Sequence, residues 1–165
     1  MRTKILITGG LGHIGSYLIN NLPAVYNITV VDNMFTNKYN SLFELTRNIN
    51  FINCDFSNVP VNVLESADII LHLAAITDAA NPNNHDDIET INIGLTKLFI
   101  DQCAKHSDAK FIFPSSTSVY GVSSECVTED DDKFINPQSP YAESKIEIEN
   151  YLKKSNIKYT ILRLG

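Results

Sequence analysis

Two residues at helical spacing, Tyr141 and Lys145, could carry out acid–base chemistry. They lie four residues apart in the segment SPYAESK (139–145). Pro140 is a favoured first residue of a helix, and this spacing would then place both side chains on one helical face. A lysine ammonium close to a tyrosine hydroxyl favours the phenolate and lowers the tyrosine pKa, which would make Tyr141 a general base. The same spacing also occurs on solvated helix faces.

A run of hydroxyl side chains could hold the group on which such a base acts. Residues 115–118 read Ser-Ser-Thr-Ser and follow an apolar segment that is typical of a buried strand. Open α/β sheets bind their ligands at the carboxyl ends of strands, which is where this run would lie. We therefore expect Ser116 to position a substrate oxygen. Serine clusters are also common in loops that have no catalytic role.

A glycine-rich turn follows the first apolar segment, in the sequence TGGLGHIG (8–15). Gly9, Gly12 and Gly15 would allow a tight turn, a close approach of the backbone to a pyrophosphate, and close packing of the following helix. The unpaired N–H groups at the start of that helix favour a negatively charged group. Three glycines in such a turn can also be purely structural.

An acidic residue at the end of the second apolar segment indicates which dinucleotide would bind. Asp32 stands seventeen residues after Gly15. A carboxylate there accepts hydrogen bonds from ribose hydroxyls and repels a 2′-phosphate, which favours NAD over NADP. The alternative is that Asp32 only caps a turn with Asn33. Asp55, after the third apolar segment, could accept a hydrogen bond from the adenine amine or could be a turn residue.

Short apolar segments alternate with amphipathic ones along the chain. Buried strands are predicted at residues 4–8, 28–32, 49–53, 68–73, 110–114 and 158–164. Helices are predicted at residues 13–22, 88–106 and 141–155, the second with Ile88, Ile91, Leu95, Leu98 and Phe99 on one face. Strands that alternate with helices imply right-handed crossovers. The predicted fold class is therefore α/β: a doubly wound, mostly parallel sheet with helices on both faces, which is a Rossmann fold.

Composition and charge exclude several classes of protein. The chain has 165 residues, of which 44% are hydrophobic and 19% charged, as expected for one globular domain with a core. A formal net charge of −6 argues against nucleic-acid and anionic-membrane partners. No apolar stretch approaches the ~18 residues of a membrane span, and no signal peptide is evident. The widely spaced Cys54, Cys103 and Cys126 match neither a metal site nor a disulfide framework, so we predict a cytoplasmic protein.

In combination and order, these motifs resemble the N-terminal part of the extended short-chain dehydrogenase/reductase superfamily, in particular its NAD-dependent nucleotide-sugar epimerase/dehydratase family. The likeness covers all 165 residues and includes HLAA (72–75), Asn92, VYG (119–121) and LRLG (162–165). It implies that residues 73–75 line the nicotinamide side of the groove, that Asn92 lies near the cofactor and that Lys145 also binds the nicotinamide ribose. The predicted cofactor-binding residues are Gly9, Gly12, His13, Ile14, Gly15, Asp32, Asn33, Asp55, Phe56, Leu73, Ala74, Ala75, Asn92, Tyr141 and Lys145, and the predicted catalytic residues are Ser116, Tyr141 and Lys145.

The resemblance also implies a reaction on a nucleotide sugar. Tyr141 would take the proton of a sugar hydroxyl while hydride passes to NAD, with Ser116 holding the oxygen, and an epimerase would return the hydride to the other face of the sugar. Dehydratases of the family have an Asp-Glu pair just before Val-Tyr-Gly, where this chain has Thr117 and Ser118. This difference favours an activity like that of UDP-glucose 4-epimerase over a dehydratase. Reductases of the family share the same residues, so a reductase activity is a further alternative.

The likeness also bears on what the 165 residues can do alone. Relatives of this kind continue far beyond the equivalent of Gly165, and that continuation supplies most of the nucleotide-sugar pocket. We therefore expect this C-terminal substrate-binding segment to be absent here, and the chain to bind NAD without turnover. The alternative is a non-catalytic dinucleotide-sensing or partner-binding module. Packing of the helices that contain Ile88 and Tyr141 would form a homodimer.

Overall fold

The computed structural model describes residues 2–35, 37–78, 85–122, 127–128 and 132–165. Cys126, one of the three cysteines considered above, lies outside these residues.

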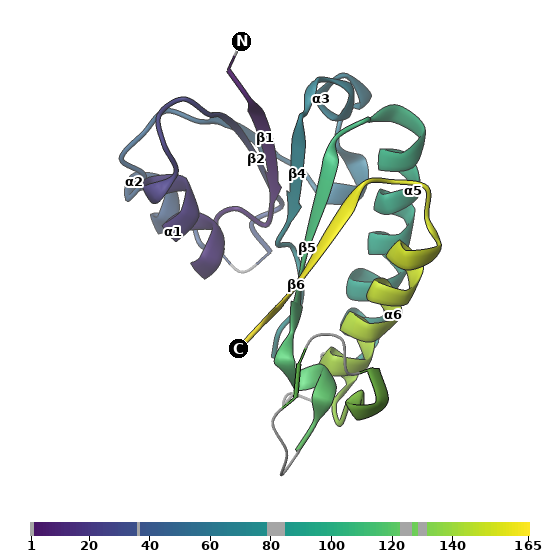
Figure 1. Cartoon of the computed structure of the whole chain (residues 1–165). Coiled ribbons are helices and arrows are strands. Elements are labelled where there is room, and N and C mark those ends of the chain that lie inside the picture. The colour runs from purple at the N-terminus through teal and green to yellow at the C-terminus, as the bar shows by residue number, and fades with distance from the viewer. Residues whose placement is uncertain (1, 36, 79–84, 123–126, 129–131) are drawn as a thin grey trace.

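Six strands form one parallel sheet in the order β3-β2-β1-β4-β5-β6 (Figure 1). They are β1 (Lys4–Thr8), β2 (Asn27–Asp32), β3 (Asn50–Asn53), β4 (Ile69–His72), β5 (Lys110–Ser116) and β6 (Tyr159–Leu164). Each predicted strand is present, with ends that differ by no more than two residues. Because β1 pairs with both β2 and β4, the strand order reverses there, which opens a crevice at the carboxyl ends of these strands.

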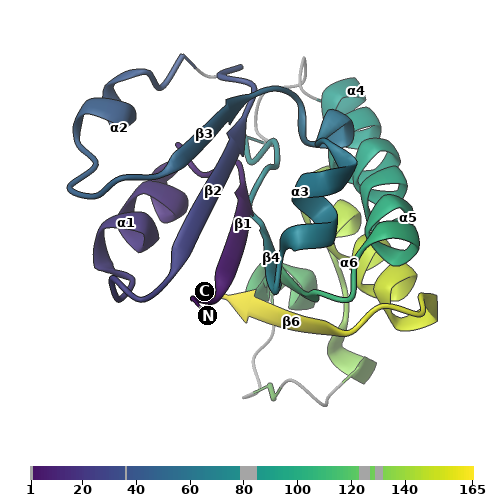
Figure 2. The same cartoon turned by 90° about the horizontal axis from the view of Figure 1, so that it is seen from above.

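Helices cover both faces of the sheet, as predicted (Figure 2). One face carries α1 (His13–Asn21) and α2 (Asn40–Phe43), and the other carries α3 (Val61–Ser66), α5 (Thr96–His106) and α6 (Pro140–Lys154). The sequence periodicity did not predict α3, because six residues are too few to show a helical repeat. The shorter elements are α4 (His85–Asp87), the π-helix η3 (Ile88–Leu95) and the 3₁₀ turns η1 (Phe56–Asn58), η4 (Thr117–Tyr120) and η5 (Asp132–Phe134).

Each face of the sheet has its own apolar core. Ile7 and Ile19 belong to the core beneath α1, whereas Phe99, Phe111 and Ile148 belong to the core between the sheet and α5 and α6. All five side chains are at most 1% exposed. The two cores hold the strands and helices whose ends form the crevice. Among the described helices, none combines the length and apolar character needed to cross a membrane.

The start of α6 follows directly from its sequence. The Ser139 hydroxyl accepts a hydrogen bond from the N–H of Ala142 at 3.2 Å, and Pro140 occupies the first helical position. Lys153 and Lys154 lie in the last turn, where positive charge is favourable beside the helix dipole. The helix therefore begins one residue before the predicted Tyr141.

The long helix predicted over residues 88–106 is wrong in one respect, because its first half is a π-helix. Residues Ile88–Leu95 adopt the π-helical form, in which each backbone N–H bonds to the carbonyl oxygen five residues earlier. Wider turns of this kind change which residues face the core. Thus Asn92 and Thr96 are buried, whereas Leu98, which was predicted on the apolar face, is 56% exposed.

Candidate active site

A groove of about 450 Å³ lies at the carboxyl ends of β1, β4 and β5, where the strand order reverses. It joins the glycine-rich turn to the N-terminal part of α6. Asp55 and Asn92 are not among its lining residues. The predicted site residues that line it are Gly9, Gly12, His13, Ile14, Gly15, Asp32, Asn33, Phe56, Leu73, Ala74, Ala75, Ser116, Tyr141 and Lys145.

The three glycines of the turn have three different local environments. Gly9 has a φ of +65°, and a Cβ there would lie 2.6 Å from the backbone nitrogen of Ala74. A Cβ on Gly15 would lie 2.4 Å from the carbonyl oxygen of Gly10, so the helix packs against the turn itself. A Cβ on Gly12 would meet only the carbonyl oxygen of Gly9, at 3.1 Å. Gly12 therefore has the open side on which a ligand could approach the backbone.

Asp32 ties the glycine-rich turn to the end of β2. Its carboxylate accepts hydrogen bonds from the N–H of Leu11 at 3.1 Å and from the N–H of Met34 at 2.8 Å. The second contact is the turn cap that the sequence left open as an alternative. Because the carboxylate also lines the groove, capping and ligand binding are compatible roles for this residue.

Two predicted cofactor-binding residues support the groove from outside its lining. Asp55 accepts hydrogen bonds from the side-chain amide of Asn33 at 3.0 Å and from the N–H of Ser57 at 2.9 Å. The buried amide of Asn92 accepts from the N–H of Ile76 and donates to its carbonyl oxygen, both at 2.8 Å. Since Asn33 and Ile76 line the groove, these contacts shape its walls.

Lys145 is largely buried in the wall of the groove and is held from several sides. Its Nζ donates to the carbonyl oxygen of Pro114 at 2.9 Å and lies 4.7 Å from the centroid of the Phe113 ring. It also lies 5.3 Å from the centroid of the Tyr141 ring. Burial lowers the pKa of Lys145 to about 8, while the charge of Glu149 acts in the opposite direction. The ammonium form therefore predominates at neutral pH.

The pKa of Tyr141 differs from the sequence-based expectation. Burial raises the pKa of its hydroxyl, whereas we expected Lys145 to lower it. Burial disfavours the charged phenolate, and the described hydrogen bond of the Lys145 ammonium goes to the carbonyl oxygen of Pro114. Without a further cation in the groove, Tyr141 is thus a protonated phenol at neutral pH.

Ser116 is the last residue of β5 and the N-cap of the turn η4. Its Oγ accepts a hydrogen bond from the N–H of Ser118 at 3.1 Å, so the hydroxyl proton can be donated to another oxygen. Both Ser116 and Tyr141 line the groove. The structure thus places a hydroxyl donor and a phenol on one ligand-accessible surface.

His72 is a buried, neutral residue in the wall of the groove. Its Nδ1 lies 2.7 Å from the Thr8 hydroxyl and its Nε2 lies 3.1 Å from the Thr96 hydroxyl. Burial, with a smaller contribution from the charge of Lys145, lowers the pKa of His72 to about 3. The imidazole therefore links β1, β4 and α5 without taking up a proton in the physiological range.

Several residues of the groove had no signal in the sequence. Phe35, Lys38 and Thr77 come from loops whose positions depend on the tertiary fold. Ser115 belongs to the serine run, but its role emerges only from its partner, Glu149. A neighbour on another element cannot be read from local spacing.

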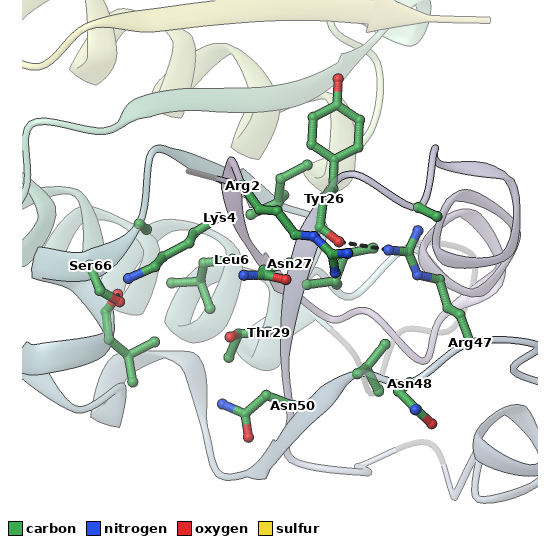
Figure 3. Close-up of a pocket in the computed structure, with 16 residues that line it drawn as sticks. Arg2, Lys4, Leu6, Tyr26, Asn27, Thr29, Arg47, Asn48, Asn50 and Ser66 are labelled. Carbon is green, nitrogen blue, oxygen red and sulfur yellow. Dashed lines mark hydrogen bonds between the residues drawn. The ribbon is translucent and has the colours of Figure 1, made fainter.

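A second hollow, of about 590 Å³, lies at the amino ends of β1, β2 and β3 (Figure 3). Lys4 and Arg47 contribute positive charge to it, and none of the described residues that line it is acidic. The Arg47 guanidinium donates to the carbonyl oxygen of Leu22 at 2.8 Å. It also donates to the carbonyl oxygen of Tyr26 at 2.7 Å (Figure 3). Arg47 thus fastens the connection between α1 and β2. The residues with candidate chemistry all lie at the other end of the sheet.

Comparisons with known proteins find relatives that are named as nucleotide-sugar enzymes. It is 34% identical to the UDP-N-acetyl-alpha-D-glucosaminuronate decarboxylase of Bacillus cytotoxicus, over 84% of this chain and 44% of that protein. It is 31% identical to the dTDP-D-glucose 4,6-dehydratase of Dictyostelium discoideum, over 91% of this chain and 39% of that protein. The chain spans about half the length of the curated relatives it matches.

Solved structures agree with the sequence relatives. The UDP-glucuronic acid 4-epimerase of Bacillus cereus, in complex with UDP-glucuronic acid and NAD, matches with a TM-score of 0.86 and 32% identity. The match covers 98% of this chain and 56% of that one, and it confirms the Rossmann fold. The predicted relationship to nucleotide-sugar epimerases and dehydratases is also confirmed. Residues 6–161 match the 3-beta hydroxysteroid dehydrogenase/isomerase family, and the chain therefore belongs to that family.

Proposed function

We propose that the groove binds NAD and that the chain is the cofactor-binding part of an NAD-dependent, epimerase-type oxidoreductase of nucleotide sugars. The observation that carries this proposal is the single groove shared by the glycine-rich turn, Asp32, Ser116, Tyr141 and Lys145. The Bacillus cereus epimerase, whose structure contains NAD, supports it.

The residues present fit a dinucleotide. The open side of Gly12 lets backbone N–H groups approach a diphosphate, and the start of α1 favours its negative charge. The Asp32 carboxylate lines the groove next to this turn and can accept from ribose hydroxyls. A 2′-phosphate would face this carboxylate, so we propose NAD over NADP.

The chain's own residues would handle the proton of the substrate. Bound NAD supplies hydride exchange with the sugar carbon. Tyr141 accepts the proton of the sugar hydroxyl, and Ser116 donates its hydroxyl hydrogen to the same oxygen. Lys145 stabilises the phenolate of Tyr141 through its charge and binds the nicotinamide ribose. A positively charged nicotinamide acts in the same direction on the Tyr141 pKa.

The residues after Ser116 favour an epimerase among the possible activities. Thr117 and Ser118 stand where dehydratases of the family have an Asp-Glu pair. Neither a threonine nor a serine can exchange a proton at neutral pH as a carboxylate does. Transient oxidation followed by return of the hydride needs only the residues already named.

Two further parts of the proposal concern the chain as a whole. Because it spans about half of its relatives' length, we propose that these 165 residues bind NAD but do not orient a sugar. Orientation can supply about 7–11 kcal/mol of barrier reduction, so conversion should be unmeasurable without it. The homodimer through the helices of Ile88 and Tyr141 stays a prediction, which light scattering of the purified chain would test.

Calorimetry and a turnover assay test this function together. The 165-residue chain is titrated with NAD⁺, NADH, NADP⁺ and NADPH, and then incubated with NAD⁺ and UDP-, GDP-, CDP- and dTDP-sugars. We expect NAD⁺ and NADH to bind more tightly than their phosphorylated forms, and no epimer, keto product or NADH to accumulate. Absence of NAD binding would refute the cofactor assignment. Robust conversion of any sugar would show that the chain already contains a sufficient substrate site.

A further inference from the structure

A buried carboxylate lies one helical turn beyond the candidate catalytic pair. Glu149 follows Lys145 by four residues on α6, as Lys145 follows Tyr141, so the three side chains lie along one side of the helix. Glu149 is 1% exposed. A carboxylate in such a place needs partners that offset the cost of removing it from water.

The partners of Glu149 come from the ends of two neighbouring strands. The Ser115 hydroxyl donates to Oε1 at 2.5 Å. Arg163 donates to the same oxygen through Nε at 3.0 Å and to Oε2 through Nη2 at 2.6 Å. Ser115 of β5 and Arg163 of β6 are paired in the sheet register. Glu149 therefore clamps α6 to the carboxyl ends of β5 and β6.

The same arginine extends the clamp to the turn that follows Ser116. Arg163 Nη1 donates to the Tyr120 hydroxyl at 2.5 Å, and its guanidinium carbon lies 4.9 Å from the centroid of the Tyr120 ring. Tyr120 is the last residue of η4, which begins directly after Ser116. Two of the motifs that resemble the family, VYG (119–121) and LRLG (162–165), thus contribute Tyr120 and Arg163 to one network.

This network bears directly on Lys145. The charged and titratable groups around Lys145 are Glu149 and Tyr141 on α6, His72 on β4 and, through Glu149, Arg163 on β6. Of these, Glu149 is the negative charge, and it raises the pKa of Lys145 against the effect of burial. Ser115, which donates to Glu149, directly follows Pro114, whose carbonyl oxygen accepts a hydrogen bond from Lys145. Glu149 thus affects Lys145 through its charge and through the position of this strand end.

We propose that Glu149 is a positioning residue of the candidate active site: its carboxylate fixes α6 against Ser115 and Arg163 and keeps Lys145 charged beside Tyr141. This inference deepens the proposed function and rests on it for its catalytic meaning. Stability alone does not account for such a pair, because a buried ion pair is often no more stabilising than apolar residues of the same volume. The position of Glu149 next to the candidate catalytic pair gives the ion pair a role in the site.

The test compares two glutamates of the same helix in the chain without cofactor. Glu149→Gln keeps the shape of the side chain and removes its charge. Glu147→Gln is the matched control, because Glu147 pairs with Lys97 at 2.6 Å on the exposed surface. The pH at which Lys145 titrates is measured by NMR of ¹³C-labelled lysine, with Lys145→Met to assign the signal.

We expect Glu149→Gln to lower the Lys145 midpoint by about one pH unit, because the negative charge that raises the pKa of Lys145 is lost. Glu147→Gln should titrate like the wild-type chain. Equal midpoints in the two variants would overturn the proposal. If Glu149→Gln does not fold, the double variant Glu149→Gln/Arg163→Met removes both charges. Its Lys145 midpoint should still lie below that of the wild type, and an unchanged midpoint would again refute the role.

A separate measurement keeps this inference distinct from the proposed function. The NMR titration requires no cofactor, whereas the function is tested by NAD binding. If the wild-type chain does not bind NAD, the proposed function is refuted. The effect of Glu149 on the Lys145 midpoint can still be measured. In a complete enzyme, Glu149→Gln should also move the alkaline limb of kcat to lower pH, and a uniform loss of kcat at every pH would contradict positioning.

Discussion

Separate alanine substitutions in the glycine-rich turn should distinguish folding from cofactor binding. In Gly15→Ala, the new Cβ would lie 2.4 Å from the carbonyl oxygen and 2.6 Å from the Cα of Gly10. Both atoms are backbone, so no side-chain rotation relieves the overlap. A clash of this kind costs about 3 kcal/mol, and the better helix propensity of alanine returns about 1 kcal/mol. The net loss of about 2 kcal/mol should lower the Tm by about 4–8 °C.

Gly12→Ala should instead leave the Tm nearly unchanged and weaken NAD binding. Its Cβ would contact only the carbonyl oxygen of Gly9, at 3.1 Å, and the backbone at Gly12 (φ −66°, ψ 175°) is accessible to alanine. The fold should therefore keep its Tm to within a few degrees. The methyl group, however, would occupy the side on which a diphosphate approaches the backbone. NAD affinity should fall at least tenfold, about 1.4 kcal/mol.

A third glycine provides the control for both substitutions. Gly94 lies in η3, and a Cβ there would be 3.8 Å from its nearest neighbour, the carbonyl oxygen of Glu89. Gly94→Ala should keep or raise the Tm and leave NAD binding unchanged. Circular dichroism measures the three Tm values, and calorimetry measures the affinities. A Gly15→Ala chain as stable as the wild type, or a Gly12→Ala chain with wild-type NAD affinity, would refute this account of the turn.

Three further predictions concern charge and proton transfer. Asp32→Asn should narrow the preference for NADH over NADPH, because the carboxylate no longer repels a 2′-phosphate; an unchanged ratio in calorimetry would count against its role. In a complete enzyme, Tyr141→Phe should lower turnover by roughly 10² to 10⁴ and keep NAD affinity, whereas near-normal turnover would exclude Tyr141 as the base. Burial lowers the pKa of Lys145 from 10.5 to about 8, so the unfolded chain binds more protons between these values and stability should rise with pH there. Urea unfolding should show this rise in the wild type relative to Lys145→Met, and parallel pH dependences would contradict it.

The fold was predictable because its signals are local. A buried parallel strand is a short apolar run, and each run lies between segments of helical period or turn residues, so the strands from β1 to β6 could be located within two residues. The glycine-rich turn and Asp32 are close in sequence to the strands that carry them. Strand order then brings Ser116 and Tyr141 to the same groove, since ligands of such sheets bind where the order reverses.

Other features were not predictable because they depend on partners far apart in sequence. The π-helix has no distinct hydrophobic period in the sequence. In the structure Thr96 is buried and Leu98 is exposed, whereas the sequence predicted Leu98 on the apolar face. Asn92 was expected near the cofactor, yet its amide bonds to the backbone of Ile76 and to the Ser144 hydroxyl. Its effect on the groove is indirect, through the wall that it holds in place.

Tyr141 and Lys145, the candidate catalytic pair, show how sequence spacing and tertiary environment contribute separately. Four-residue spacing correctly places Tyr141 and Lys145 on one side of α6, because that follows from helix geometry alone. The pKa of Tyr141 depends instead on its tertiary surroundings: the fold buries the phenol, and the Lys145 ammonium donates to the carbonyl oxygen of Pro114. Burial then dominates and the phenol keeps its proton. A positively charged nicotinamide in the groove would add a second cation near Tyr141 and lower its pKa. Binding of the oxidised cofactor and activation of Tyr141 are therefore expected to be coupled.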